Sequence, residues 1–485
     1  MTDPILDLSA HDLIAAFRAR TLSPVEALAA VTARAAEVEP TVNALVDELP
    51  ELALAAAQEA ERRYAGQGEP PRALEGVPLA IKEEQPIAGL SWRMGSLTTE
   101  GLVADETHPV VERVLAAGAV VHARTTTPEF SCAAFTESTL WGLTTNPWNA
   151  AYGPGGSSGG SGAALAAQET FLATGSDIGG SIRIPSSLNG IVGFKPPYAR
   201  VPGIPPFNLD TYCHDGPMGR SVADVALLQN VIAGQHPIDP VSLPTIPPMA
   251  LPLDPDSARG LRVAVATVVG DFPVDPDVRA NTARFADALR AAGLVVTQVE
   301  LPITREMVTT AALVHFGAIF GPSITPDGGE PDPRLTTYAR DFARLSTARM
   351  AEIGFYRGLE LESQVQAAIM AVFADHDALV VPTLGTTGYA AGDDFVGHGI
   401  TVDGIELEHY LEGAFTPIFN IASRHPVLAV PSGIAGNGVP TGVQVVGRPY
   451  DDATVFIVGA AAERELRWWA DPAWRPSVGA GVGSR

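Results

Sequence analysis

The chain has 485 residues, of which 46% are hydrophobic and 18% charged, a composition that is typical of globular proteins and excludes a mostly disordered chain. Its 55 acidic and 31 basic residues give a net charge of −24 at pH 7, and no basic stripe offsets this charge, so nucleic acid is not an expected partner. The sequence shows neither a basic N-terminal segment followed by an apolar run, as in a signal peptide, nor a stretch of about 18 apolar residues that could span a membrane. This pattern predicts a cytoplasmic protein without membrane contact.

Helical and strand patterns alternate along the chain. The capping box Ser23-Pro24-Val25-Glu26 predicts a first helix over 24–37. Apolar periodicity then predicts, in chain order, strand 77–82, helix 108–117, strands 119–122 and 171–175, helix 222–233, strand 261–266, helix 277–292, strand 294–299, helix 346–373, strands 378–382, 427–431 and 442–446, and helix 451–465. This alternation predicts a layered α/β fold.

Residues 237–256, PIDPVSLPTIPPMALPLDPD, contain too many prolines for a helix or a strand, so they are expected to form a surface connection. We find no internal repeat, and we expect a single domain over 1–485. The only cysteines, Cys132 and Cys213, exclude a disulfide framework, and the scattered histidines lack an HExxH motif. Neither a metal nor another cofactor is therefore expected.

Two glycine-serine segments stand out in residues 153–185, GPGGSSGGSGAALAAQETFLATGSDIGGSIRIP. A phosphate-binding P-loop needs a lysine after its last glycine, and none occurs here. Gly156-Ser157-Ser158-Gly159-Gly160 fits the G-x-S-x-G elbow of α/β-hydrolases, with Ser158 as the nucleophile. That motif requires a strand directly before it, whereas the preceding NPWNAAYGP is typical of turns.

The second segment, 176–181, follows the apolar strand FLATG. Its adjacent glycines let several backbone N–H groups point at one position, so the amides of Ile178, Gly179, Gly180 and Ser181 are candidates for an oxyanion hole. Ser181 is then the candidate attacking hydroxyl. No histidine lies between His122 and His214 to act as its base, and the candidate is Lys82, at the end of strand 77–82. A lysine acts as a base only in its neutral form, which burial favours.

These residues resemble the amidase signature family of serine hydrolases, which uses a Ser-cisSer-Lys triad. The resemblance rests on GVPLAIKE at 76–83, TTNPWN at 144–149, the two glycine-serine segments, GFKP at 193–196, GPMGRSVAD at 216–224 and PTGVQVVGRPYDD at 440–452. It is strong over 70–230, the expected catalytic core, and thin in the C-terminal half.

The resemblance implies a mixed, twisted central sheet covered by helices on both faces, and an amidase that cleaves linear amides through an acyl-enzyme. It implies that Ser181 is the nucleophile, that Ser157 follows a cis peptide bond and relays a proton, and that Lys82 is the base. It also implies that Cys132 and Ser157 contact the substrate. An amidotransferase subunit that releases ammonia from glutamine, a carbamate or ester hydrolase, and a catalytically silent binding protein remain alternatives.

Several residues depart from the family pattern or have structural interpretations. Glu83 replaces the usual Asp, Asn189 replaces a small residue, and Pro197-Tyr198-Ala199 replaces Thr-x-Gly. Glu83 and Glu84 would favour the charged form of Lys82 if they lay close, and strand alternation predicts that Glu83 points away from it. Asp177 and Arg183 are expected to form a structural pair, and the aromatic candidates for a pocket wall are Trp141, Tyr198, Phe207 and Tyr212. The expected partner is a small-molecule amide, and a homodimer is the default assembly.

Overall fold

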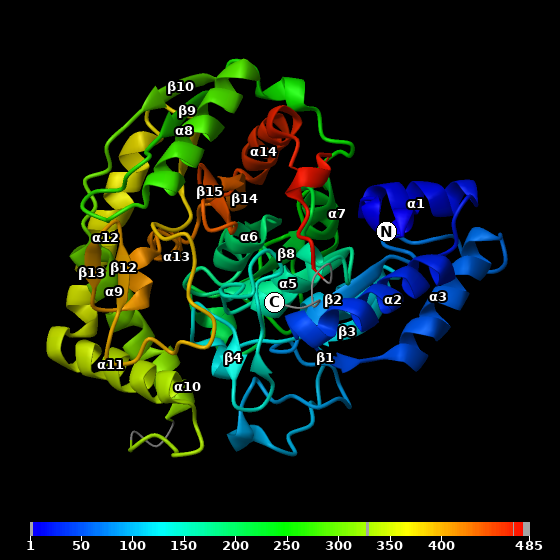
Figure 1. Ribbon diagram of the computed structural model, residues 1–485, viewed down its shortest axis with the longest axis horizontal. Helices are drawn as coiled ribbons and strands as arrows, with labels where there is room; N and C mark the ends of the chain where they lie inside the picture. Colours follow the sequence, from blue (N-terminus) through cyan, green and yellow to red (C-terminus); the bar gives the residue numbers. More distant parts are fainter. Residues whose placement is uncertain (1–2, 326–328, 469, 479–485) are drawn as a thin grey trace, which may run out of the picture.

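A mixed sheet of eleven strands forms the centre of the protein in the computed structural model, which describes residues 3–325, 329–468 and 470–478 (Figure 1). Across the sheet the strands follow the order β1 (Leu45–Glu48), β3 (Val120–Thr125), β2 (Pro78–Lys82), β6 (Leu172–Asp177), β8 (His214–Gly219), β7 (Val192–Lys195), β14 (Val427–Ile434), β15 (Pro440–Gly447), β11 (Ala378–Pro382), β9 (Arg262–Val265) and β10 (Val295–Gln298). Strands β3, β2 and β6 are parallel to one another, as are β11, β9 and β10, and the other neighbouring pairs are antiparallel. Two small hairpins, β4 (Glu137–Ser138) with β5 (Gly142–Leu143) and β12 (Ile400–Val402) with β13 (Ile405–Leu407), lie outside the sheet.

Helices connect and cover these strands. In chain order they are α1 (Ala10–Ala19), α2 (Pro24–Val42), α3 (Pro50–Tyr64), α4 (Pro109–Ala116), α5 (Gly159–Ala166), α6 (Arg183–Asn189), α7 (Val222–Ile232), α8 (Pro276–Ala291), α9 (Arg305–Ala318), α10 (Phe320–Ile324), α11 (Thr337–Ile353), α12 (Phe355–Val372), α13 (Pro417–Ile421) and α14 (Asp452–Leu466).

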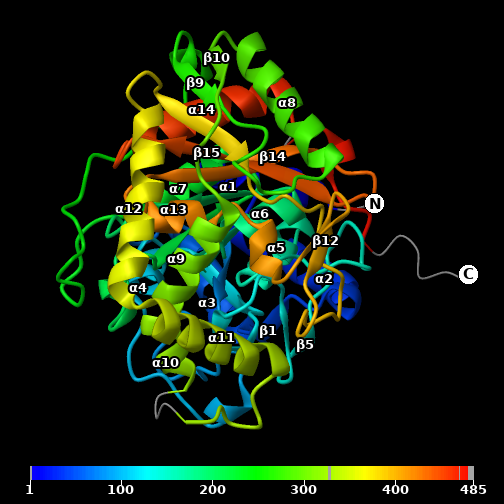
Figure 2. The same ribbon diagram turned by 90° about the vertical axis from the view of Figure 1, so that its left-hand side faces the viewer.

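Both faces of the sheet are buried, and β11 shows how. Because side chains alternate along a strand, Val380 joins a core cluster with α7, α8 and α14, whereas Leu379 and Val381 join a second cluster with α6, α9 and α12 on the other face. Helices α9, α11 and α12 pack together on that second side (Figure 1 and Figure 2). The predicted α/β fold, with a mixed sheet between helices, is confirmed.

Some predicted elements differ in their bounds. Ser23 and Glu26 form the predicted capping box, but the helix runs on to Val42. The region 346–373, predicted as one helix, contains the end of α11 and all of α12, because Gly354 between them has a φ of 83° that ends the first helix. Within the predicted connection 237–256, residues 237–254 form neither a helix nor a strand, and 244–248 are exposed. Its last two residues instead begin a 3-10 helix, Pro255–Ala258.

Candidate active site

The sheet brings Lys82 and the second glycine-serine segment together. Strands β2 and β6 are parallel neighbours, so their carboxyl ends lie at the same edge of the sheet. Lys82 ends β2, and Ser176 and Asp177 end β6. The Lys82 backbone N–H donates to Thr174 Oγ1 at 3.1 Å, which fixes the two strand ends relative to each other.

The Lys82 side chain is fully buried and contacts both glycine-serine segments. Its Nζ lies 2.7 Å from Ser157 Oγ in the first segment and 2.7 Å from Ser176 Oγ in the second. A third contact, at 2.6 Å, is with Glu84 Oε2. The proposed base is therefore within hydrogen-bonding distance of the proposed relay serine.

The first segment forms a turn that leads into α5. The Gly156–Ser157 peptide bond is cis, as the family resemblance implied. A side chain at Gly156 would place its Cβ 2.5 Å from the Phe135 carbonyl oxygen, so this close approach requires glycine. Residues 153–157 are all described and none of them is in a strand, so the strand that an elbow centred on Ser158 would need is missing. Ser158 is buried, and its hydroxyl contacts the backbone of Ser176.

The second segment is organised by Asp177. Its carboxylate accepts hydrogen bonds from the N–H of Gly180 at 2.9 Å and from that of Ile182 at 3.2 Å. It also forms a bidentate ion pair with Arg183. The Gly180 N–H is thus committed to Asp177, which corrects its predicted place among the oxyanion donors. No acceptor within the described part of the chain takes the N–H of Ile178, Gly179 or Ser181.

The Asp177–Arg183 pair also anchors the loop to the C-terminal half of the chain, in keeping with its predicted structural role. Arg183 donates to the Thr416 carbonyl, Asn420 Oδ1 and Gln444 Oε1 at 2.6–2.8 Å. Burial alone would raise the pKa of Asp177, but the Arg183 guanidinium and the Asn420 amide hold it well below its usual range. The loop therefore carries a buried carboxylate that stays ionised.

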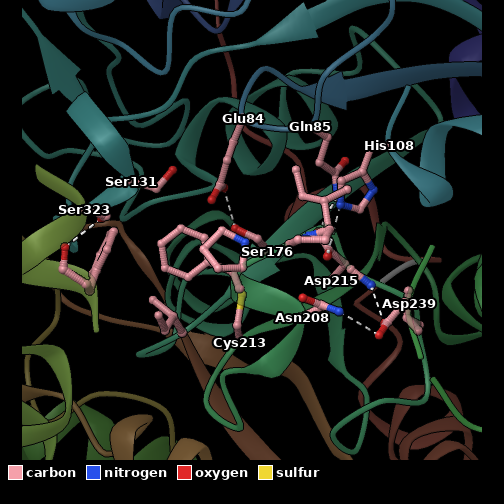
Figure 3. Close-up of a pocket in the computed structure, with 18 of the residues that line it drawn as sticks. Glu84, Gln85, His108, Ser131, Ser176, Asn208, Cys213, Asp215, Asp239 and Ser323 are labelled. Carbon is pink, nitrogen blue, oxygen red and sulfur yellow. Dashed lines mark hydrogen bonds and ion pairs between the residues drawn. The ribbon is translucent and has the colours of Figure 1, made fainter. Parts of the chain in front are cut away.

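Ser157 and Ser176 line a cavity of about 240 Å³. Figure 3 shows Ser176 in its wall. Its wall combines aromatic rings with three carboxylates, those of Glu84, Asp215 and Asp239, and the described lining contains no Lys or Arg. Figure 3 shows the Glu84 side chain pointing toward Ser176, with Asp215 and Asp239 further along the wall. Asp215 accepts from Gln85 at 2.7 Å and lies 3.4 Å from His108 Nε2.

Ser181 opens on a second, smaller hollow of about 30 Å³. Cys132 lies in its wall beside Ser181, together with Phe316, Phe320 and Phe342. Ser131, Ile178 and Phe320 line both this hollow and the larger cavity, so the two adjoin. Burial raises the pKa of the Cys132 thiol well above its usual range, which leaves it a neutral wall residue.

The other candidates divide between wall and core. Tyr198 and Phe207 line the larger cavity, whereas Trp141 lines neither hollow and Tyr212 is buried against His315. Glu83 points away from Lys82, as predicted: it accepts the N–H groups of Arg93 and Met94 and pairs with Arg124 at 3.3 Å. Burial raises the pKa of Glu83 to about 7, against the pull of Arg124.

In the described ranges, no group of three His, Cys, Asp or Glu side chains is arranged to hold a metal ion. Nor does any helix there have the length and apolar character needed to cross a membrane.

Comparison with known proteins agrees with this geometry. The sequence model of the Amidase family matches residues 26–456. This chain belongs to the amidase family. A glutamyl-tRNA(Gln) amidotransferase subunit from Chloroflexus aurantiacus is 34% identical over 94% of the chain and 96% of its own length.

Solved amidase structures share the whole fold. A bacterial aryl acylamidase of the amidase signature family superposes with a TM-score of 0.87 at 26% identity, over 98% of this chain and 100% of that one. The 6-aminohexanoate cyclic dimer hydrolase, solved with its substrate, has a TM-score of 0.83 at 28% identity, over 98% and 99% of the two chains. The protein is therefore an amidase-family enzyme, a hydrolase or an amidotransferase, which disfavours the catalytically silent alternative.

The geometry also shows contacts of this amidase site that the sequence analysis did not predict. Ser176 and Glu84 both contact Lys82, and Gln85 and His108 hold Asp215 in the cavity wall. Glu84 follows β2 by two residues, and a turn at 83–84 brings its side chain back to Lys82. The sequence contains no marker of that turn.

Proposed function

We propose that the protein is an amidase that hydrolyses a carboxamide C–N bond to an acid and an amine or ammonia. The observation that carries the proposal is the 2.7 Å hydrogen bond between Lys82 Nζ and Ser157 Oγ, beside a hollow lined by Ser181. A buried lysine joined to a serine, next to a second serine in a loop of free amides, suits nucleophilic attack on a carbonyl.

In the proposed mechanism, neutral Lys82 takes the Ser157 proton while Ser157 takes the Ser181 proton, and Ser181 Oγ bonds to the carbonyl carbon. When the C–N bond breaks, the proton returns through Ser157 to the departing amine. Water then adds to the acyl-enzyme in the same way: its proton passes through Ser157 to Lys82, and a proton returns through Ser157 to Ser181 Oγ as the acyl–oxygen bond breaks and the acid leaves.

The N–H groups of Ile178, Gly179 and Ser181 are proposed to stabilise the oxyanion. They have no acceptor in the described structure, unlike the N–H of Gly180. An oxyanion-hole donor contributes about 3 kcal/mol to transition-state stabilisation. Asp177 and Arg183 hold this loop and line neither hollow.

The walls support an apolar amide as the substrate. Aromatic rings from Trp92, Phe130, Tyr198 and Phe207 line the larger cavity, which has three carboxylates and no Lys or Arg in its described lining. Such a wall disfavours a substrate that carries a carboxylate. We propose linear aryl or alkyl amides, and hydrolysis of cyclic oligoamides, carbamates or esters in a substrate panel would revise this class.

The test compares Ser181→Ala with Ser158→Ala. Ser181→Ala should abolish both amide turnover and labelling by a fluorophosphonate. Ser158→Ala, a matched change in the neighbouring segment, should keep most of both. Mass spectrometry of the labelled protein should place the adduct on Ser181. An adduct on Ser158 instead would contradict the proposal.

A second candidate function follows from the curated relative, which is part of an amidotransferase and matches almost the whole chain. In that case the protein would release ammonia from glutamine and would work with protein partners. Glutaminase activity that exceeds hydrolysis of every aryl and alkyl amide, together with a co-purifying partner, would favour it. The carboxylate-rich wall favours the amidase instead, because glutamine brings its own carboxylate.

A further inference from the structure

The surroundings of Lys82 match a charged lysine. An ammonium group has three N–H donors and no lone pair, and Lys82 Nζ has three acceptors at hydrogen-bonding distance: Ser157 Oγ, Ser176 Oγ and Glu84 Oε2. The Ser176 hydroxyl donates onward to Glu84 Oε2 at 2.6 Å. Glu84 therefore forms an ion pair with Lys82 and also accepts a hydrogen bond from Ser176.

A lysine in this state cannot accept the proton of Ser157. It must first lose a proton, and a carboxylate 2.6 Å away opposes that loss, because an opposite charge at this distance favours the ionised form. The Lys82 side chain is fully buried, so little water screens the attraction. Glu84 is about one-third exposed and lines the larger cavity.

The other charged groups around Lys82 are already paired. Arg124 from β3 pairs with Glu83 and Asp47, Asp177 from β6 pairs with Arg183, and Asp215 from β8 faces His108 of the turn before α4. The Cys213 thiol, next to β8, is kept neutral because burial raises its pKa well above the usual range. Within the described residues, Glu84 is thus the carboxylate in direct contact with Lys82.

We propose that Glu84 is a positioning residue that sets the pH at which Lys82 becomes a base. In the free enzyme it holds Lys82 as an ammonium, with Ser176 as the bridge, and so confines activity to the neutral and alkaline range. This inference rests on the proposed function of Lys82, and it assigns to Glu84 a role that neither attack nor oxyanion binding requires.

The test measures the second-order rate of Ser181 labelling by a fluorophosphonate against pH, which needs no knowledge of the natural substrate. Glu84→Gln keeps the size of the side chain and an oxygen for Lys82 and Ser176, but removes the charge. The labelling rate should rise with pH, and the midpoint of this rise, the acid limb, should move to lower pH by about one unit or more in Glu84→Gln. Below the wild-type midpoint, the labelling rate of Glu84→Gln should therefore be about tenfold higher than that of the wild type. Glu84→Asp, which restores the carboxylate, should return the limb toward the wild-type position.

Asp239→Asn is the control. Asp239 is another carboxylate of the same cavity, but it accepts from Asn208 and from the Gly203 N–H and has no contact with Lys82. Its acid limb should stay at the wild-type pH. If Glu84→Gln fails to fold, as judged by circular dichroism, the comparison is made between Glu84→Ala and Glu84→Asp.

An acid limb that stays in place or moves to higher pH in Glu84→Gln, or in Glu84→Ala where that variant replaces it, would overturn the inference. The proposed function would still stand, provided that Ser181→Ala is silent. Labelling that persists in Ser181→Ala would instead overturn the proposed function itself. The two failures are therefore distinguishable.

Discussion

At the scale of single residues, the loop 178–182 depends on one backbone conformation. Gly180 has a φ of 129°, a region that other residues rarely adopt, and its Cβ would fall 2.1 Å from Thr416 Oγ1. This conformation turns the Gly180 N–H toward Asp177 and leaves the neighbouring amides without an acceptor. Gly179 is different, since a Cβ there would meet only Phe316 Cζ, at 3.3 Å.

Gly180→Ala should therefore disrupt the site, and Gly179→Ala is its matched control. The strained φ and the clash with Thr416 should cost about 1–3 kcal/mol of stability and displace the loop amides. We expect fluorophosphonate labelling of Gly180→Ala to fall at least tenfold with a lower melting temperature. Gly179→Ala should melt close to the wild type. Equal melting temperatures and labelling rates in the two variants would refute this account of the loop.

Sequence motifs predict the three proposed catalytic residues, but they do not predict the contacts around them. The motifs point to Lys82, Ser157 and Ser181, because the glycine-rich context of the serines and the strand before the lysine are local features of the sequence. Glu84 was expected to favour the charged form of Lys82 if it lay close, and only the structure shows that it does, since the contact depends on a turn after β2. The donor role of Gly180 was mispredicted, because a list of adjacent amides does not reveal which of them a carboxylate takes.

At the scale of elements, a buried charged cluster fastens the cavity wall to two helices. His315 on α9 lies 2.7 Å from Asp210 and 3.3 Å from Glu362 on α12. Asp210 closely follows the cavity-wall residues Phe207 and Asn208 in the sequence. The Tyr212 ring stacks on His315 with centroids 3.6 Å apart. Burial alone would lower the pKa of His315, but its hydrogen bonds to the two carboxylates raise it to about 9.

This cluster predicts a pH-dependent stability. Because the folded pKa of His315 lies above its value of about 6.5 in the unfolded chain, its contribution is complete below about pH 6.5 and is lost as the pH rises through about 9. The loss is on the order of 3 kcal/mol at most. The melting temperature of the wild type should fall more steeply between pH 7 and 10 than that of His315→Gln. Parallel curves for the two proteins would show that the histidine is not charged in the folded state.

Among the strands, prediction succeeded where an apolar run marks the strand and failed where buried strands lack one. Helices α1, α3 and α9 were also not predicted, although their apolar residues recur at helical spacing. Strand β8, with the sequence HDGPMG, and β7, with VGFK, are fully buried, yet their Gly, Pro and charged residues are not typical of strands. Their place is set by neighbouring strands on both sides. The short helix α6, with Pro185 inside it, likewise depends on the packing of Ile184 and Leu188 against the core.

At the scale of the whole molecule, the proline-rich connection 237–256 does not separate two sheets. The strands that precede the connection in the sequence form one half of the sheet, with β7 at its inner edge, and the strands that follow it form the other half, with β14 at its inner edge. These two strands pair directly, Val427 with Lys195 and Leu428 with Phe194. The ring of Phe194 also packs on Phe456 of α14, with centroids 4.7 Å apart. Arg183, beside the proposed nucleophile, bonds to Thr416 and Gln444 from the later half. We propose that the chain folds as one domain.

A cut in the connection tests this proposal. A protease recognition sequence inserted after Pro247, within the exposed stretch 244–248, should be cleaved in the folded protein. The two fragments should elute together on gel filtration and keep fluorophosphonate labelling, because the β7–β14 pairing and the Arg183 hydrogen bonds do not depend on the cut peptide. The fragment 1–247 expressed alone should not be labelled, since it lacks the acceptors that hold Arg183. Fragments that separate while the first still labels would show two independent domains and place the whole active site in the N-terminal one.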